Sequence, residues 1–192
     1  TSAMLDGLLD PANTVVWREF DSRYRPILFG FAKKMGLSED DAADVAQDTM
    51  VRFVQEYRGG KYDRAKGRLR SWIIGIIKYR VIDVHRLRAT RRERRGDSAL
   101  ATLPDDKELT ELWQAERRRS LLGQAIAELR EQTRLNEKTI RAFELYAIHQ
   151  RPSAEVAQEL GITPHDVRMA KSNVAARLRV ILTRLEEVFD DG

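Results

Sequence analysis

The stretch SAEVAQELGITPHDVRMAKSNVAARL, residues 153–178, reads as two helices joined by a tight turn. Ser153 is a residue type that caps the first turn of a helix. Gly161 follows the first apolar segment, where helices commonly end in a left-handed backbone. Thr163 can cap the second helix, and Pro164 suits its first position because that position needs no amide hydrogen. The pattern predicts a short helix, a glycine corner and a longer helix.

This helix pair has the spacing of a helix-turn-helix. Ala157 is small enough for a close helix crossing, Gly161 supplies the corner, and Val167 supplies an apolar anchor. The remaining side chains of the second helix suit base edges and phosphates. They are Thr163, His165, Asp166, Arg168, Met169, Lys171, Ser172 and Arg177. A DNA-reading helix is the favoured interpretation, and an αα-hairpin inside an ordinary helical bundle is the alternative.

The composition extends the helical interpretation to the whole chain. Of the 192 residues, 42% are hydrophobic and 33% are charged, with 11 Gly and 5 Pro, a balance that favours helices and can bury a core. Apolar residues recur every three or four positions, without the alternation typical of strands. We therefore expect an all-α protein of two small helical domains. The absence of cysteine excludes disulfides and thiolate metal sites, and it fits a cytoplasmic location.

The hydrophobic spacing predicts two helices in the first domain, over residues 13–34 and 36–60. Pro26 is expected to kink or divide the first of them. Ser38 is the predicted N-cap of the second helix, and Gly59 and Gly60 close it. Its apolar stripe is Ala42, Val45, Ala46, Thr49, Met50, Phe53, Val54 and Tyr57. Its polar side carries Asp44, Gln47, Asp48, Arg52 and Gln55.

The next predicted helix starts near Leu69 and ends its apolar stripe near Leu87, while basic residues continue to position 95. Residues 67–95 carry ten Lys and Arg against two carboxylates, a balance of +8, whereas residues 96–116 carry a balance of −5. Such blocks predict a basic surface for nucleic acid followed by a flexible acidic linker. We place the first domain at 1–95, the linker at 96–115 and the second domain at 116–192, with a helix over 111–130.

Three segments together resemble the extracytoplasmic-function sigma factors of bacterial RNA polymerase. They are AADVAQDTMVRFVQEY (42–57), GRLRSWIIGIIKYRVIDVHR (67–86) and EVAQELGITPHDVRMAKSNVAARL (155–178), and the likeness runs from about 17 to 182. The resemblance implies core RNA polymerase as a partner, through the clamp coiled coil of its largest subunit and the flap. The implied clamp-binding residues are Asp44, Gln47, Asp48, Arg52 and Gln55. Promoter DNA is the second implied partner, and family members are often held by an anti-sigma factor.

The middle segment resembles the part of these proteins that opens and reads the minus-ten element. The implied DNA-binding residues are Tyr62, Arg64, Lys66, Arg68, Trp72, Lys78, Tyr79, Arg80, His85, Arg86 and Arg88. The loop over 61–68 corresponds to the one that receives a flipped base in the family. Tyr79 replaces the usual asparagine, and an aromatic ring at this place can stack on an unpaired base. The helical stripe, however, favours a core position for Trp72 over a contact with a base.

The last segment resembles the domain that reads the minus-thirty-five element, with the helix-turn-helix described above. Its implied contacts are the eight side chains of the second helix. The family's usual entry of Gly, Leu and Ser is replaced here by residues 150–153, QRPS, which alters the turn before the first helix.

Two other classes of protein remain as alternatives. The first is a conventional dimeric helix-turn-helix regulator that acts without docking on polymerase. The second is a peripheral membrane protein that uses the basic helix over 67–95. The longest apolar run, 72–77, is far below the roughly 20 residues that span a bilayer, so we predict no membrane insertion. Histidines at 85, 149 and 165 lie far apart, and we predict no metal, no cofactor and no enzymatic activity.

Overall fold

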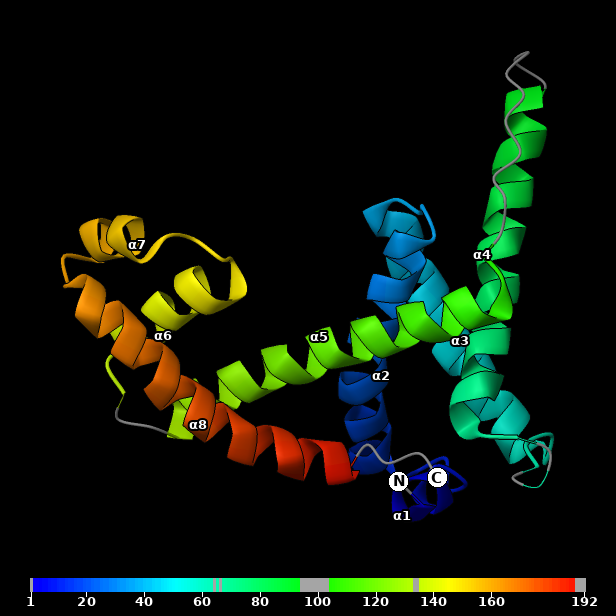
Figure 1. The fold of residues 1–192 in the computed structure, drawn as a ribbon. Coiled ribbons are helices and arrows are strands. Elements are labelled where there is room, and N and C mark those ends of the chain that lie inside the picture. Colours follow the sequence, from blue (N-terminus) through cyan, green and yellow to red (C-terminus); the bar gives the residue numbers. More distant parts are fainter. Residues whose placement is uncertain (1, 64, 66, 94–103, 133–134, 189–192) are drawn as a thin grey trace. The chain divides into compact units, whose positions relative to one another are not determined.

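A computed structural model describes residues 2–63, 65, 67–93, 104–132 and 135–188. Every regular element in this part of the chain is a helix, which confirms the all-α prediction. The chain divides into two compact units, one up to Ser120 and one over Leu121–Phe189. Figure 1 shows their helices, and each unit is described by itself.

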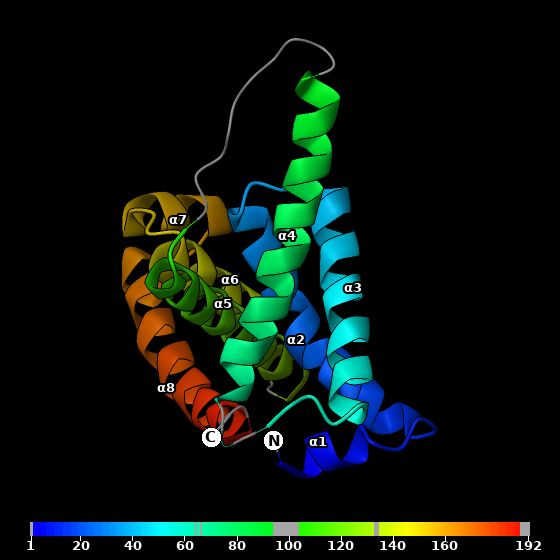
Figure 2. The ribbon, with the colours of Figure 1, turned by 90° about the vertical axis from the view of Figure 1, so that its right-hand side faces the viewer.

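Unit 1 is built from α1 (Ser2–Gly7), α2 (Thr14–Lys34), α3 (Glu39–Arg58), α4 (Leu69–Glu93) and the first part of α5 (Asp106–Gln132). α3 packs against both α2 and α4, and Figure 2 shows these three helices from the side. α2 is continuous through Pro26, so this proline does not divide the helix. Tyr24 and Ile27 are buried on either side of it and hold both halves of α2 in the core.

The predicted stripe of α3 is confirmed: its members from Ala42 to Val54 are buried, and Tyr57 at its end is half-buried. Ser38 accepts a hydrogen bond from the Asp41 amide at 3.2 Å, which is the predicted N-cap. In α4, Leu69, Ile73, Ile77 and Val81 are buried at helical spacing. The sequence pattern therefore placed the core face of α3 correctly and that of α4 as far as Val81, whereas Leu87, where the stripe was predicted to end, is exposed.

The start of α5 differs from the predicted start near position 111. Asp105 accepts from the Glu108 amide at 2.8 Å, and Glu108 accepts from the Asp105 amide at 3.0 Å. This reciprocal capping box starts the helix five residues earlier. Leu109 and Trp113 are buried in unit 1, so residues 106–115, assigned above to the linker, are helical. Residues 96–103 of that linker lie outside the described part of the chain.

Unit 2 contains the end of α5, α6 (Glu137–Phe143), a π-helical turn η1 (Glu144–Ile148), α7 (Ser153–Leu160) and α8 (Pro164–Val188). The α-helix α6 thus continues directly into the wider π-helical turn η1. One apolar cluster joins α5, α6 and α8 through residues such as Leu129, Phe143 and Leu178. A second cluster joins α7 to α8 through Val156, Ala157, Val167 and Ala170, and residues of α6 and η1 belong to it.

The corner between α7 and α8 has the predicted geometry. Gly161 has φ 63° and ψ 44°, a left-handed conformation that glycine adopts without strain. Thr163 Oγ1 accepts from the Asp166 amide at 3.1 Å, and Pro164 opens the helix. The predicted capping role of Ser153 is wrong. Pro152 is the N-cap of α7 and Ser153 is its first helical residue, because the extended backbone of the proline (ψ 137°) sets the helix start.

Candidate nucleic-acid interface

Four aromatic rings meet where the loop over 61–68 joins α3 to α4. Tyr62 stacks on Trp72 with ring centroids 5.1 Å apart and planes inclined by 17°. Trp72 also contacts Phe53 at 5.3 Å, and Tyr62 lies 6.0 Å from Tyr57. Phe53 is anchored in the core by stacking on Phe20 at 4.9 Å. The half-buried pair of Tyr62 and Trp72 is therefore supported by buried rings beneath it.

The loop forms a small pocket of about 220 Å³ beside this pair. Its lining residues are Lys61, Tyr62, Asp63, Gly67, Arg68, Ser71 and Trp72. The Tyr62 hydroxyl donates to the Gly67 carbonyl at 3.3 Å, and the Ala65 amide donates to Asp63 at 2.9 Å. Arg64 and Lys66, predicted to bind DNA here, lie outside the described residues. The pocket thus combines a flat aromatic wall with cationic groups at its mouth, a combination suited to an unstacked base.

A second pocket, of about 400 Å³, lies between α3 and α4. It is lined by Arg52, Glu56, Ser71, Trp72, Gly75, Ile76, Tyr79, Arg80 and Asp83. Tyr79 is 69% exposed, which is unusual for so large an aromatic side chain. Trp72 and Ser71 belong to both pockets, so the two pockets are neighbours on one surface.

The predicted minus-ten residues of α4 fall on two faces. Trp72, Tyr79 and Arg80 line the second pocket, and Arg86 is exposed one turn after Asp83. Lys78, His85 and Arg88 have internal partners instead. Lys78 pairs with Asp106 at 2.8 Å, and His85 Nε2 lies 2.9 Å from the Met35 carbonyl. Arg88 pairs with Asp41 and donates a hydrogen bond to Ser38. These three side chains tie α4 to the α2–α3 turn and to α5.

Sequence reasoning missed five lining residues of the second pocket: Glu56, Ser71, Gly75, Ile76 and Asp83. Ser71 and Gly75 are one helical turn apart on α4, and Tyr79 is one turn further. A helical projection of α4 from Ser71 would have identified this polar face between two buried stripes.

The polar side of α3 carries the predicted partner-binding residues. Asp44, Gln47, Asp48, Arg52 and Gln55 are all exposed. The structure therefore brings the five together on one helix face.

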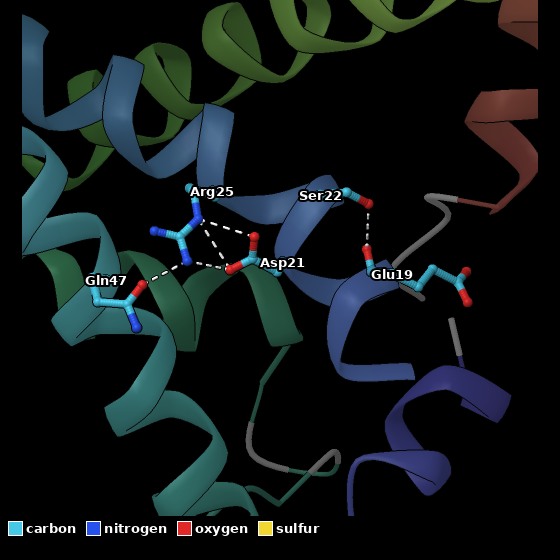
Figure 3. A network of polar contacts seen from close by, with 5 residues as sticks. All are labelled: Glu19, Asp21, Ser22, Arg25 and Gln47. Atoms are coloured by element: carbon cyan, nitrogen blue, oxygen red, sulfur yellow. Dashed lines mark hydrogen bonds and ion pairs between the residues drawn. The ribbon is translucent and has the colours of Figure 1, made fainter. Parts of the chain in front are cut away.

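One member of this face is held by α2 (Figure 3). The Gln47 side-chain oxygen accepts from Arg25 Nη2 at 2.5 Å, and Arg25 Nε donates to both carboxylate oxygens of Asp21 at 3.0 Å. The hydrogen bond with Asp21 raises the pKa of Arg25 above its usual value. The Gln47 amide group is consequently oriented by a fixed cation rather than by solvent.

The second helix of the helix-turn-helix presents most of its predicted residues to solvent. The exposed set is Thr163, His165, Asp166, Arg168, Met169, Lys171, Ser172 and Arg177. Lys171 Nζ lies 5.6 Å from the centre of the Tyr146 ring, a cation–π contact with η1.

Asp166 has a structural use besides any contact with DNA. Its carboxylate accepts from the Thr163 hydroxyl at 2.7 Å and from the Thr163 amide at 3.0 Å. These hydrogen bonds lower the pKa of Asp166. The side chain therefore completes a capping box at the start of α8.

Other kinds of site are not evident in the described part of the chain. No group of three His, Cys, Asp or Glu residues there is placed to hold a metal ion. None of the described helices has the length and apolarity to cross a membrane.

Part of the chain resembles a known protein family. Residues 20–93 match the family model described as Sigma-70 region 2. Two solved structures show similarity: CnrH in complex with the cytosolic domain of CnrY, and the sigma factor RpoE in complex with the anti-sigma factor NepR from Bartonella quintana. The first is 21% identical over 95% of this chain and 96% of that chain, with a TM-score of 0.38. The second is 17% identical over 87% and 96%, with a TM-score of 0.36. No curated protein sequence matches the chain.

The family model covers 74 of the 192 residues. Its matched residues extend from α2 to the end of α4, and they include both pockets and the exposed face of α3. Within the chain, residues 20–93 are therefore similar to sigma-70 region 2.

Proposed function

We propose that this chain is an RNA polymerase sigma factor of the extracytoplasmic-function type, directing core RNA polymerase to specific promoters and helping to melt them. The observation that carries the proposal is the stacked pair of Tyr62 and Trp72 beside a base-sized pocket, inside the segment that matches region 2. A helix-turn-helix on the same chain supports a second DNA contact. Two weak DNA contacts on one chain give tight binding only when both form at the same time.

The exposed face of α3 is the proposed contact with the clamp coiled coil of the polymerase. Asp44 and Asp48 offer two negative charges, and Gln47 is pre-oriented by Arg25. A side chain already held in one geometry loses less conformational entropy on binding. Unit 2 is proposed to contact the polymerase flap, and an anti-sigma factor is a proposed regulatory partner.

The two pockets are the proposed minus-ten site. The pocket under Tyr62 would receive a base flipped out of the duplex, so that binding energy offsets the cost of unstacking. Tyr79, in the neighbouring pocket, would stack on a second unpaired base, and Arg80 would contact the backbone. Lys78, His85 and Arg88 are proposed as minus-ten contacts only if their internal partners exchange, which makes Tyr79 and Arg80 the stronger candidates on α4.

The exposed residues of α8 are the proposed minus-thirty-five readers. Arg168 and Lys171 supply cations for phosphates and guanine edges. Asp166 and Thr163 chiefly fix the helix start that presents those side chains.

Transcription in vitro with purified core polymerase tests the proposal. We expect promoter-specific initiation that depends on adding this chain. If the chain neither binds core enzyme nor directs initiation, the extracytoplasmic-function assignment is wrong. Sequence-specific DNA binding as a dimer without polymerase would instead support the conventional regulator.

A further inference from the structure

Glu56 of α3 is an acidic side chain on the wall of the pocket between α3 and α4. It pairs with Arg52, one turn earlier on the helix, and both residues line the pocket. Pairs at this spacing are common on solvated helix faces. Here, however, the Glu56 side chain is only 16% exposed, whereas that of Arg52 is 50% exposed. The carboxylate has therefore lost much of its water and depends on hydrogen bonds within the pocket.

Both cationic partners of Glu56 lie at the same carboxylate oxygen. Arg52 Nε donates to Oε1 at 2.8 Å, and Lys61 Nζ lies 3.7 Å from Oε1. Among the described residues, no hydrogen bond reaches Oε2. A carboxylate accepts at both oxygens, and a shielded acceptor without a donor is unfavourable. The pocket wall is therefore stabilised by a ligand that brings an N–H group to Oε2.

Gly75 widens the α4 wall of the same pocket. It lies inside a helix, where glycine is less favourable than alanine. A Cβ atom added at Gly75 would have no heavy atom within 4 Å outside its own helical turn. Packing of the described residues thus does not require a glycine here. The room that it leaves belongs to a pocket of about 400 Å³, a size typical of small-ligand sites.

The pocket has a second carboxylate, Asp83 of α4. Asp83 is exposed and has water as an alternative donor, whereas Glu56 is half-buried. A hydrogen bond shielded from water is electrostatically stronger than one in water. Trp72 and Tyr79 add aromatic walls against which a base can stack. Of the two carboxylates, Glu56 is thus the one suited to read the edge of a stacked base.

We infer that Glu56 is a specificity-determining residue, which selects in this pocket an unpaired base with an amino group over thymine. The inference rests on the proposed function, in which a second unpaired base stacks on Tyr79. An amino group of adenine, cytosine or guanine would donate to Oε2 of Glu56. A thymine carbonyl at the same place would face a carboxylate with no proton to share, and the shielded acceptor would stay unpaired. Glu56 would thus read the base edge, while Tyr79 reads only the aromatic face.

Binding of reconstituted holoenzyme to forked promoter DNA identifies the base concerned, with an abasic site at each unpaired minus-ten position in turn. Gly75→Leu fills the pocket from its α4 wall, and leucine is a good helix former, so the variant should fold. At one position the abasic site should weaken binding of the wild-type protein but have little effect on Gly75→Leu. The base at that position is the one that enters the pocket.

The same position then carries either thymine or 5-methylcytosine, two bases of equal size. The second bears an amino group where thymine bears a carbonyl. We expect wild-type protein to bind the 5-methylcytosine DNA about tenfold or more tightly, as for one hydrogen bond to a charged group. Glu56→Gln keeps the side-chain volume, and its amide can donate or accept, so the ratio should fall to within about twofold. Asp83→Asn, the matched control, removes the same charge from the same pocket and should change both affinities by one factor.

Equal affinity of wild-type protein for the two bases would overturn the inference without recourse to any variant. A preference that survives Glu56→Gln, or that disappears with Asp83→Asn, would also overturn it. Abasic effects that Gly75→Leu leaves unchanged at every position would show that no base enters this pocket, whereas recognition by the loop pocket would stand. Failure to form holoenzyme, or abasic sites without effect at any position, would overturn the proposed function itself. Thermal melting checks that each variant is folded.

Discussion

Tyr62→Ala should weaken promoter opening without unfolding unit 1. The ring is half-buried and stacks on Trp72 at 5.1 Å, so its loss removes one wall of the loop pocket while Phe53 and Phe20 keep the core packed. Stacking on an aromatic side chain contributes ~1–3 kcal/mol per base, which corresponds to about 5- to 150-fold in binding. Tyr62→Phe keeps the ring and loses only a long hydrogen bond to Gly67, so it should retain most of the affinity.

The assay is binding of reconstituted holoenzyme to forked promoter DNA, with and without an abasic site at each unpaired minus-ten position. At one minus-ten position, the abasic site should weaken binding of the wild-type protein. The same abasic site should weaken binding of Tyr62→Ala only a little further, because the variant already lacks the contact with that base. Thermal melting of the variants checks the fold. Equal losses from the abasic sites in wild type and Tyr62→Ala at every position would refute stacking in this pocket.

Three further predictions concern other parts of the chain. Asp48→Lys should impair core-polymerase binding while leaving the melting temperature unchanged, and unaltered affinity in a pull-down would remove α3 as the docking face. Gly161→Ala should destabilise unit 2 by ~1–2 kcal/mol, because alanine at φ 63° is strained, and urea unfolding would measure this. The folded-state pKa of Asp166 is lowered by its bonds to Thr163, so its stabilisation is present above the unfolded pKa near 3.8 and is lost as pH falls through the lower folded value. NMR titration should show the Thr163 amide shifting in that acidic window, and Asp166→Asn should abolish the shift; a shift that persists would refute the assignment.

The helices could be predicted from the sequence because the helix caps and the hydrophobic spacing agreed with the tertiary packing. Ser38, Gly161 and Pro164 all occupy the predicted helix ends. The start of α5 was missed because an aspartate replaces the serine or threonine usually sought in a capping box. Burial of Trp113 was missed because its partners on α2 lie some 80 residues away, where periodicity within one segment carries no information.

The candidate site was only partly readable. A basic run predicted DNA contact for α4, but charge does not indicate which way a side chain points. Lys78, His85 and Arg88 share one side of the helix and are engaged within unit 1. The residues that line the second pocket became apparent only once α3 and α4 were placed together.

Trp72 forms a common wall of the loop pocket and the pocket between α3 and α4. Under the proposed function, each pocket accommodates a different promoter base, so one side chain takes part in two acts of recognition. A substitution at Trp72 would then change the preference for both bases at once, whereas a substitution at Tyr62 or at Tyr79 would change the preference for one base. Promoters served by descendants of this protein would accordingly change at those two bases as a linked pair whenever the tryptophan changes.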